Sequence, residues 1–391
     1  MFGVGIYINT DTVITRIIES TLMTSLKPGN VTGLFGARRT GKTILMESIR
    51  KKLSTQKVLH VQGENLDVSE ILSSQRLSVL QNFVNGYDFL FVDEAQKIRN
   101  IGLNLKLIVD SIPGISVFVT GSSAFDLRGN IGEPLTGRST FYNLYPFALG
   151  ELEEDFLTSK ENLEKKLIFG LYPQVVNAIN DEERIKVLES IRDGYLLRDI
   201  LELDNLKDSI FIINLLRLLA FQIGQDVSLA ELAANLRVSR KTVERYLELL
   251  EKSFILFSTR GFSRNLRKEF SKSPRYYFWD NGIRNSVISN FGRLAVRDDT
   301  GRLWENFCIS ERMKINHYNQ RSVNCYFWRT YDQKEIDLIE ESNGQLSAFE
   351  FKWSVNKGKV PKDFIDNYPG STFAVINPET YLPFIKRKER M

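Results

Sequence analysis

Residues 31–43, which read Val-Thr-Gly-Leu-Phe-Gly-Ala-Arg-Arg-Thr-Gly-Lys-Thr, constrain the fold of this chain more than any other segment. They consist of a short apolar strand, the pattern G-x-x-x-x-G-K-T, and the start of an amphipathic helix near Ile44. This is the phosphate-binding loop pattern in the context that it requires, with a strand before it and a helix after it. The sequence therefore predicts a nucleoside-triphosphate site within an α/β fold.

The residue types in this loop match the chemistry of a triphosphate. Two glycines let the backbone curl so that successive N–H groups point at phosphate oxygens, and the following helix adds its positive N-terminal end. We expect Lys42 to reach the β- and γ-phosphates of ATP and the Thr43 hydroxyl to bind Mg²⁺. The alternative is an ordinary Gly-rich turn, which the flanking strand and helix disfavour. The predicted contact residues are Gly36, Ala37, Arg38, Arg39, Thr40, Gly41, Lys42, Thr43 and Ile44.

A second apolar run, residues 89–92 after Asp88, leads directly into Asp93 and Glu94. Such a run is typical of a central strand that is buried on both faces. Acids at its carboxyl end lie where ligands bind in open α/β sheets. We expect Asp93 to hold Mg²⁺, usually through water, and Glu94 to orient or deprotonate the attacking water. The alternative is a strand that simply ends in solvated acids.

A third apolar strand, residues 115–120, is followed by Gly121 and Ser122. The Ser122 hydroxyl is a candidate sensor that would hydrogen-bond the γ-phosphate or the attacking water. A turn rich in Gly and Ser is the competing interpretation. A last strand of this unit is expected over residues 140–145.

These motifs together resemble the predicted AAA+ ATPases of bacteria and archaea, which carry a winged-helix segment and a C-terminal domain of unknown function related to restriction endonucleases. The resemblance covers essentially the whole chain. It implies that an arginine just before the last core strand acts as a finger on the γ-phosphate, in cis or from a neighbour. Arg138 matches that place and Arg128 is the reserve candidate; a plain surface arginine is the alternative for both. The segments that carry the resemblance are 36–43, 93–94, 120–122, 135–138 and 144–147.

Composition limits the other classes of site. A chain of 391 residues, 42% apolar and 26% charged, is expected to be a soluble protein of two or three domains. No run approaches the ~20 apolar residues of a membrane span, and the N-terminus lacks the features of a secretory signal. Two cysteines and two histidines exclude a disulfide framework, a zinc site and a histidine-rich metal site, and suit a reducing cytoplasm.

The middle of the chain is predicted to be helical. Residues 151–158, 161–169 and 183–203 have helical apolar spacing, and their position suits the helical lid of an AAA+ protein. A helix-turn-helix is expected over residues 227–251, with Ser228 and Ser239 as the two N-caps.

The second helix of this pair would point Arg240, Lys241 and Arg245 outward, as a recognition helix does. Residues 226–275 contain eleven Lys or Arg and six Asp or Glu, and the whole positive excess lies in 258–275, where a wing is expected. Because the net charge of the chain is only +4, a nucleic-acid surface requires such a local patch. A packing or protein-contact role is the alternative. The candidate DNA-binding residues are Arg240, Lys241, Arg245, Arg264, Arg267 and Lys268.

The C-terminal segment contains an acidic pattern on expected strands joined by an Asn343-Gly344 turn. Glu350 and Lys352 share one face of their strand, and Asp337 on the partner strand can face them. Two carboxylates would then bind Mg²⁺ while the lysine activates water or stabilises charge on phosphate. The alternative is a set of exposed cross-strand ion pairs. The set resembles the active site of restriction-endonuclease-like nucleases, which implies that Glu305 is their helix carboxylate.

The predicted fold is therefore α/β: an AAA+-type parallel sheet over 1–150, a helical lid over 151–207, a winged helix over 208–290, and a restriction-endonuclease-like α/β domain over 300–391. The predicted function is cytoplasmic ATP binding and hydrolysis that controls a DNA-binding, Mg²⁺-dependent nuclease module. One alternative is a nucleotide-switched regulator that holds DNA or a protein partner without cleaving it. Another is a partner-directed defence or toxin–antitoxin component. A homo-oligomer is compatible with a finger acting in trans, and the choice between DNA and RNA stays open.

Overall fold

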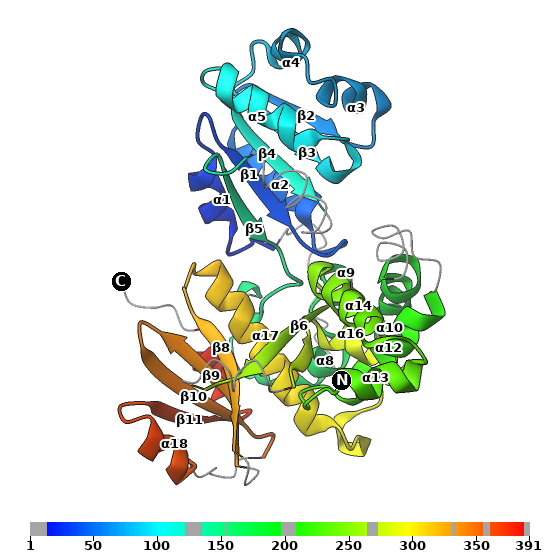
Figure 1. Cartoon of the computed structure of the whole chain (residues 1–391), viewed down its shortest axis with the longest axis vertical. Coiled ribbons are helices and arrows are strands. Elements are labelled where there is room, and N and C mark those ends of the chain that lie inside the picture. The colour runs from blue at the N-terminus through cyan, green and yellow to red at the C-terminus, as the bar shows by residue number, and fades with distance from the viewer. Residues whose placement is uncertain are drawn as a thin grey trace, which may run out of the picture.

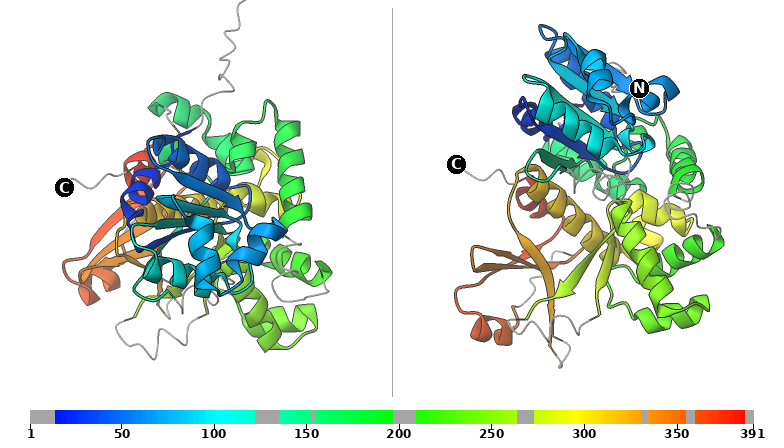
Figure 2. Two further views of the ribbon diagram at one scale, coloured as in Figure 1. Left: turned by 90° about the horizontal axis from the view of Figure 1, so that it is seen from above. Right: turned by 45° about the horizontal axis from the view of Figure 1, so that its top comes forward.

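The computed structural model describes residues 14–121, 135–152, 155–196, 209–263, 273–330, 334–354 and 360–386. Two β-sheets dominate the molecule, one of five strands at the top of Figure 1 and one of six strands below it. The segment that follows the last strand of the upper sheet leads down into the lower body, and the right view of Figure 2 shows the same division from another direction.

The upper sheet is entirely parallel, with the strand order β2-β3-β4-β1-β5. Its strands are β1 (Val31–Phe35), β2 (Val58–Gln62), β3 (Phe89–Asp93), β4 (Ser116–Gly121) and β5 (Ser139–Asn143). Every residue of β1 and of β4 is buried, as expected of strands covered on both faces. The strands predicted from the apolar runs are thus confirmed, and β4 separates β1 from β3.

Helices cover both faces of this sheet. They are α1 (Glu19–Ser25), α2 (Lys42–Lys52), α3 (Leu66–Leu72), α4 (Leu77–Val84), the single turn η1 (Ala95–Lys97) and α5 (Ile101–Ser111). Crossover connections between parallel strands are right-handed. The connections from β1 to β2 and from β3 to β4 run in opposite directions across the sheet, so their helices lie on opposite faces. Accordingly α1 contacts α2, whereas α3 and α4 contact α5.

The predicted helical segment is confirmed over most of its length. Its elements are η3 (Leu149–Glu151), α7 (Phe156–Glu161), α8 (Leu163–Phe169), α9 (Pro173–Val176), α10 (Asp181–Ile191) and the π-turn η4 (Arg192–Leu196). The helix expected over 151–158 is wrong, because the Asp155 carboxylate accepts the Thr158 N–H at 2.7 Å and starts a helix there instead. The helix predicted over 183–203 is present as α10 to Ile191 and continues as the π-turn η4 to Leu196, and residues 197–203 lie outside the described ranges.

The lower body contains a mixed sheet with the order β11-β10-β9-β8-β6-β7. Its elements are α12 (Ser209–Phe221), α13 (Leu229–Leu236), α14 (Arg240–Lys252), β6 (Leu256–Gly261), β7 (Arg275–Phe278), α16 (Asn281–Val287), η5 (Leu294–Val296), α17 (Thr300–Tyr318), β8 (Asn324–Arg329), β9 (Glu335–Ser342), β10 (Gln345–Phe351), α18 (Lys362–Asn367), β11 (Thr372–Ile376) and α19 (Tyr381–Lys386). The fold class is the α/β arrangement predicted, a parallel P-loop sheet followed by helices and a C-terminal mixed sheet.

The predicted helix-turn-helix consists of α13 and α14, capped by Ser228 and Ser239 as expected. The antiparallel pair β6–β7 follows them. However, β6 also pairs in parallel with β8 through Arg260 and Gly261, so this pair is part of the C-terminal sheet. The boundary expected between residues 290 and 300 therefore falls between elements of one continuous sheet.

Helix α17 lies at the centre of the molecule in Figure 1, between the two sheets. It is buried along most of its length, and so are its ion pairs Arg312–Glu340 and Lys314–Glu311. The ring of Tyr145, just after β5, stacks on Trp279 with ring centroids 4.1 Å apart. Upper and lower parts thus share one packed core. Within the described ranges, every helix is too short or too polar to span a bilayer.

Candidate nucleotide site and a second cluster of acids

The loop between β1 and α2 has the backbone shape of a phosphate cradle. A Cβ on Gly36 would come within 2.1 Å of the Leu144 carbonyl oxygen, so no larger residue fits there. Gly41 has φ +96° at the N-cap of α2, in the left-handed region that glycine adopts without strain. The Lys42 ammonium donates to the carbonyl oxygens of Gly36 and Ala37, at 2.9 and 3.0 Å, and lies within the curl of the loop.

Asp93 lies at the carboxyl end of β3 and accepts two side-chain hydrogen bonds. The Thr43 hydroxyl donates to Asp93 Oδ2 at 2.7 Å, and the Thr120 hydroxyl donates to Asp93 Oδ1. Thr120 also accepts the Glu94 N–H at 3.2 Å. Thr120 is the residue that sequence reasoning missed here. Its signal was the hydroxyl at the end of β4. The predicted sensor Ser122, two positions later, lies outside the described residues and stays a prediction.

Glu94 follows immediately in a left-handed conformation with φ 53°. The Gln96 side-chain amide donates to its carboxylate, and a Cβ on Gly63 would lie 2.4 Å from its carbonyl oxygen. The end of β3 is therefore tightly packed, and the Glu94 carboxylate is fixed beside Asp93. The sequence offered no signal for Gln96, which holds the Glu94 carboxylate through this contact.

These residues fit a bound Mg²⁺. The Thr43 hydroxyl and the Asp93 carboxylate are both oxygen donors, and they already meet at 2.7 Å. Mg²⁺ is usually held by one or two protein oxygens together with phosphate oxygens and water. Within the described part of the chain, no three His, Cys, Asp or Glu side chains form a group placed to hold a metal.

The remaining predicted contact residues lie along the same loop. The Thr40 hydroxyl donates to Ala37 O at 2.7 Å, which braces the curl. Arg38 is half-buried, and Arg39 donates to the Ser190 hydroxyl on α10 at 3.0 Å. Ile44 is 57% exposed on the first turn of α2. The loop thus contacts the helical segment directly through Arg39.

Arg138 lies far from this site. Its carbonyl accepts the N–H of Val31, the first residue of β1, and its guanidinium pairs with Asp110. The loop follows the last residue of β1, so Arg138 is about five strand residues, or roughly 16 Å, away along the sheet. The prediction that Arg138 acts as an arginine finger in cis is therefore wrong, and its action in trans stays a prediction. Arg128 lies outside the described residues.

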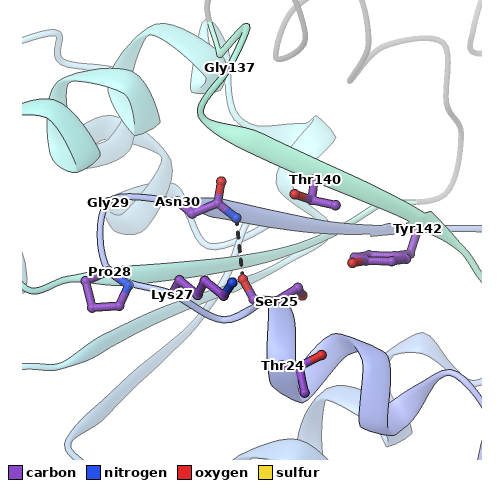
Figure 3. Close-up of a pocket in the computed structure, with 9 residues that line it drawn as sticks. All are labelled: Thr24, Ser25, Lys27, Pro28, Gly29, Asn30, Gly137, Thr140 and Tyr142. Carbon is purple, nitrogen blue, oxygen red and sulfur yellow. Dashed lines mark hydrogen bonds between the residues drawn. The ribbon is translucent and has the colours of Figure 1, made fainter.

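An open hollow of about 530 Å³ lies at this same amino-terminal edge of the sheet (Figure 3). It is lined by Thr24, Ser25, Lys27, Pro28, Gly29, Asn30, Gly137, Thr140 and Tyr142. Because the phosphate-binding loop is at the opposite, carboxyl-terminal edge, this hollow is not the nucleotide site.

The four chemistry-bearing residues predicted in the C-terminal segment lie together. Strands β9 and β10 pair up to Leu338 and Phe349, so Asp337 and Glu350 are the next facing pair. The Phe351 N–H donates to Asp337 Oδ2 at 2.8 Å, and the Lys352 ammonium pairs with Glu350 Oε1 at 2.6 Å. Two carboxylates and a lysine thus meet at one end of β10.

Glu305 approaches this cluster from α17. Its Oε1 accepts the Tyr277 hydroxyl at 2.8 Å, and a Cβ on Gly224 would lie 2.9 Å from the same oxygen. Burial raises the pKa of Glu305 well above its usual range, and the nearby charge of Asp337 raises it further. Tyr277 was missed by sequence reasoning because it reaches in from β7, on the other side of the expected domain boundary.

Asp337 and Glu350, the two predicted metal ligands, are both in this cluster, and among the described residues no three His, Cys, Asp or Glu side chains form a group placed to hold a metal. Beside the cluster, the Arg275 guanidinium pairs with Asp226 at 2.8 Å and with Glu335 at 2.9 Å. These pairs tie the segment before α13 to β7 and β9. The acids and the helix-turn-helix therefore belong to one packed unit.

Replacing Asp337 by asparagine is expected to stabilise the metal-free protein at high pH. Burial raises the pKa of Asp337 from 3.8 to about 6, so the folded state binds the proton more tightly than the unfolded state. The free energy of unfolding then falls as pH rises through that interval, by up to about 3 kcal/mol. The neutral amide avoids this cost and still accepts the Phe351 N–H.

The measurement is urea denaturation of wild type and Asp337→Asn in chelator, at pH 8 and at pH 4.5. The difference in the free energy of unfolding between the variant and wild type should be clearly larger at pH 8 than at pH 4.5. An equal margin at the two pH values, or a less stable variant at pH 8, would contradict the burial of an ionised Asp337.

The predicted DNA-binding residues of α14 are on its surface. Arg240, Lys241 and Arg245 are all exposed, and Arg240 pairs with Glu244 at 3.0 Å one turn away. The other three predicted residues, Arg264, Arg267 and Lys268, lie outside the described residues. The described patch is thus three cations with one acid among them.

Three family descriptions match successive parts of the chain: "AAA domain" over residues 28–153, "Domain of unknown function (DUF8612)" over 160–294, and "Domain of unknown function (DUF4143)" over 300–382. An uncharacterized protein of Mycobacterium tuberculosis is 26% identical over 345 residues, which cover 86% of this chain and 73% of that protein. One from Haemophilus influenzae is 25% identical over 359 residues, covering 85% of this chain and 86% of that protein.

A solved structure, a Walker-type ATPase of Pyrococcus abyssi, is 15% identical, with a TM-score of 0.46 over 71% of this chain and 96% of that chain. That likeness is distant. The family match and the parallel sheet with its loop make residues 28–153 an AAA-type P-loop ATPase domain.

Proposed function

We propose that this chain binds ATP with Mg²⁺ and hydrolyses it. The observation that carries the proposal is the contact between the Thr43 hydroxyl and the Asp93 carboxylate at 2.7 Å, beside a loop whose lysine already occupies the phosphate curl. The match of residues 28–153 to an AAA domain supports it.

Each group at the site has a separate role in this reaction. Backbone N–H groups of the loop and the positive end of α2 bind the phosphates, and Lys42 exchanges its two carbonyl partners for phosphate oxygens. Thr43 and Asp93 would hold Mg²⁺, which supplies positive charge to the phosphates. Glu94, held in place by the Gln96 amide, orients the attacking water and accepts its proton.

Phosphate release from ATP by the purified chain tests this proposal, with and without Mg²⁺ and with variants of Lys42 and Glu94 as controls. Release that requires Mg²⁺ is expected. A chain that neither binds ATP nor releases phosphate in Mg²⁺ would contradict it.

We also infer, as a second activity, that the lower body acts on DNA and that the nucleotide state controls this action. The exposed cations of α14 support binding to phosphate, and the Asp337, Glu350 and Lys352 cluster supports Mg²⁺-dependent cleavage. Because α14 and the acids belong to one packed unit, DNA bound to α14 would lie at a fixed position relative to the acids.

Charge reversal of Arg240, Lys241 and Arg245 to Glu is expected to weaken DNA binding by roughly tenfold or more at about 0.1 M salt, because three phosphate contacts are lost. The measurement is fluorescence anisotropy with labelled duplex and single-stranded DNA, with RNA in parallel. The matched control reverses three exposed lysines away from α14, namely Lys51, Lys57 and Lys165. An equal loss of DNA affinity in the two triple variants would indicate that non-specific charge attraction alone binds the DNA.

The same screen separates cleavage from binding. Cleavage in Mg²⁺ that disappears in Asp337→Ala and in Lys352→Ala, while binding persists, supports the nuclease. Binding without cleavage in wild type supports the nucleotide-switched regulator instead, and the absence of both points to a protein partner.

A further inference from the structure

Arg16, just before α1, connects the nucleotide loop to the lower body through one buried guanidinium. Its Nε donates to Glu151 Oε1 at 3.0 Å, and one terminal nitrogen donates to the Thr40 carbonyl at 2.8 Å. The other terminal nitrogen donates to the Tyr145 carbonyl at 2.8 Å and to the Tyr318 hydroxyl at 3.2 Å. Arg16 is 6% exposed, so water does not substitute for these partners.

The Thr40 carbonyl belongs to the phosphate-binding loop itself. The Thr40 hydroxyl braces Ala37, and the next residue, Gly41, carries the left-handed turn into α2. The Arg16 guanidinium therefore supports this turn through the Thr40 carbonyl. A planar guanidinium with five donors satisfies four acceptors in fixed directions, which no lysine ammonium does.

The far end of the contact lies on α17. The Tyr318 hydroxyl also accepts the Tyr145 N–H at 3.1 Å, so this one oxygen holds both the guanidinium and the segment after β5. Further along the same face of α17, Glu311 accepts the Leu149 N–H at 2.6 Å and Lys314 donates to the Phe147 carbonyl at 3.2 Å. Helix α17 is thus bonded to the segment between β5 and η3 over two turns.

Helix α17 also carries Glu305 of the acid cluster. Glu305 and Tyr318 are thirteen residues apart on one helix, which corresponds to about 20 Å. A single rigid element therefore extends from the acid cluster to the support of the nucleotide loop.

We propose that Arg16 is a positioning residue of the nucleotide site and that Tyr318 completes it, so that the lower body supports the loop that binds the phosphates. The proposal rests on the proposed nucleotide function. Nucleotide binding and the packing of the last turn of α17 are then coupled, and the coupling is reciprocal.

The test uses the full chain with Mg²⁺ and either ADP or a non-hydrolysable ATP analogue. Tyr318→Phe keeps the ring and removes the shared hydroxyl, and Arg16→Lys keeps the charge opposite Glu151 and removes the fork. Because one buried hydrogen bond corresponds to roughly tenfold in an equilibrium constant, Kd should rise about threefold to tenfold in Tyr318→Phe and tenfold or more in Arg16→Lys.

The matched control is Tyr381→Phe, which removes another buried tyrosine hydroxyl, bonded to the Ser159 carbonyl at 3.3 Å. Its Kd should equal that of wild type. All variants are compared at a temperature at which circular dichroism shows each to be fully folded.

Hydrogen exchange supplies a readout that a loss of stability alone does not produce. In wild type, nucleotide should slow exchange in the last turn of α17, and this protection should be absent in Tyr318→Phe and Arg16→Lys but retained in Tyr381→Phe. A Kd within twofold of wild type in both variants, with protection unchanged, would overturn the inference and leave the nucleotide function intact. A wild-type chain that binds no nucleotide would instead overturn the function on which the inference rests.

Discussion

Lys42→Ala is expected to weaken ATP binding by roughly 30-fold or more, and hydrolysis is lost with it. Lys42 is 5% exposed, and its ammonium lies within the curl of the loop that is predicted to hold the phosphates. Truncation of one partner of such a desolvated charge pair costs about 2–5 kcal/mol, which corresponds to a rise in Kd of roughly 30-fold to several thousandfold. Titration calorimetry with ATP and Mg²⁺ measures this directly.

The control for Lys42→Ala is Lys51→Ala on the last turn of the same helix, where the side chain is exposed and distant from the loop. Because Lys42 also donates to two loop carbonyls, the melting temperature of each variant should be recorded. A folded Lys42→Ala protein that binds ATP as tightly as wild type would remove the phosphate-binding role from this loop.

Glu94→Gln should bind ATP normally and lose turnover. Glutamine keeps the shape of the side chain and an acceptor for the Gln96 amide, but it does not accept a proton from water. Loss of a general base lowers the rate by roughly 10²- to 10⁴-fold. Single-turnover hydrolysis gives the rate, and calorimetry on the same sample shows that Kd is unchanged.

Glu64→Gln is the matched control, since Glu64 follows β2 near the same edge of the sheet and is exposed. Its turnover should equal that of wild type. If Glu94→Gln hydrolyses ATP at the wild-type rate, the base is another group, and the end of β3 has only a structural role.

One sheet joins the hairpin after the helix-turn-helix to the C-terminal strands. Since β6 pairs with both β7 and β8, the hairpin that follows the helix-turn-helix is not free to move as a separate wing. The Arg275 pairs with Asp226 and Glu335 reinforce this connection. Any nucleotide-driven change that reaches the helix-turn-helix would therefore carry the acid cluster with it.

Sequence alone determined the parts of this protein that depend on near neighbours. The glycines, lysine and threonine of the loop act through contacts within a few residues, so their spacing is sufficient to identify them. The caps of α13 and α14 are equally local, because Ser228 and Ser239 bond N–H groups three residues ahead. Apolar runs predicted the buried strands because burial on both faces requires them.

Tertiary structure decided which distant residues these local motifs contact. Thr120 contacts Asp93 because β4 lies beside β3 in the sheet. Arg138 lies at the wrong edge for a finger in cis because β5 runs parallel to β1.

The longest of these connections joins Arg16 to Tyr318 across 302 residues. Only the packing of the whole chain brings such groups within hydrogen-bonding distance, and no local pattern records it. Propensity and spacing act over a few residues, whereas a buried donor must be paired by whichever acceptor the fold places next to it.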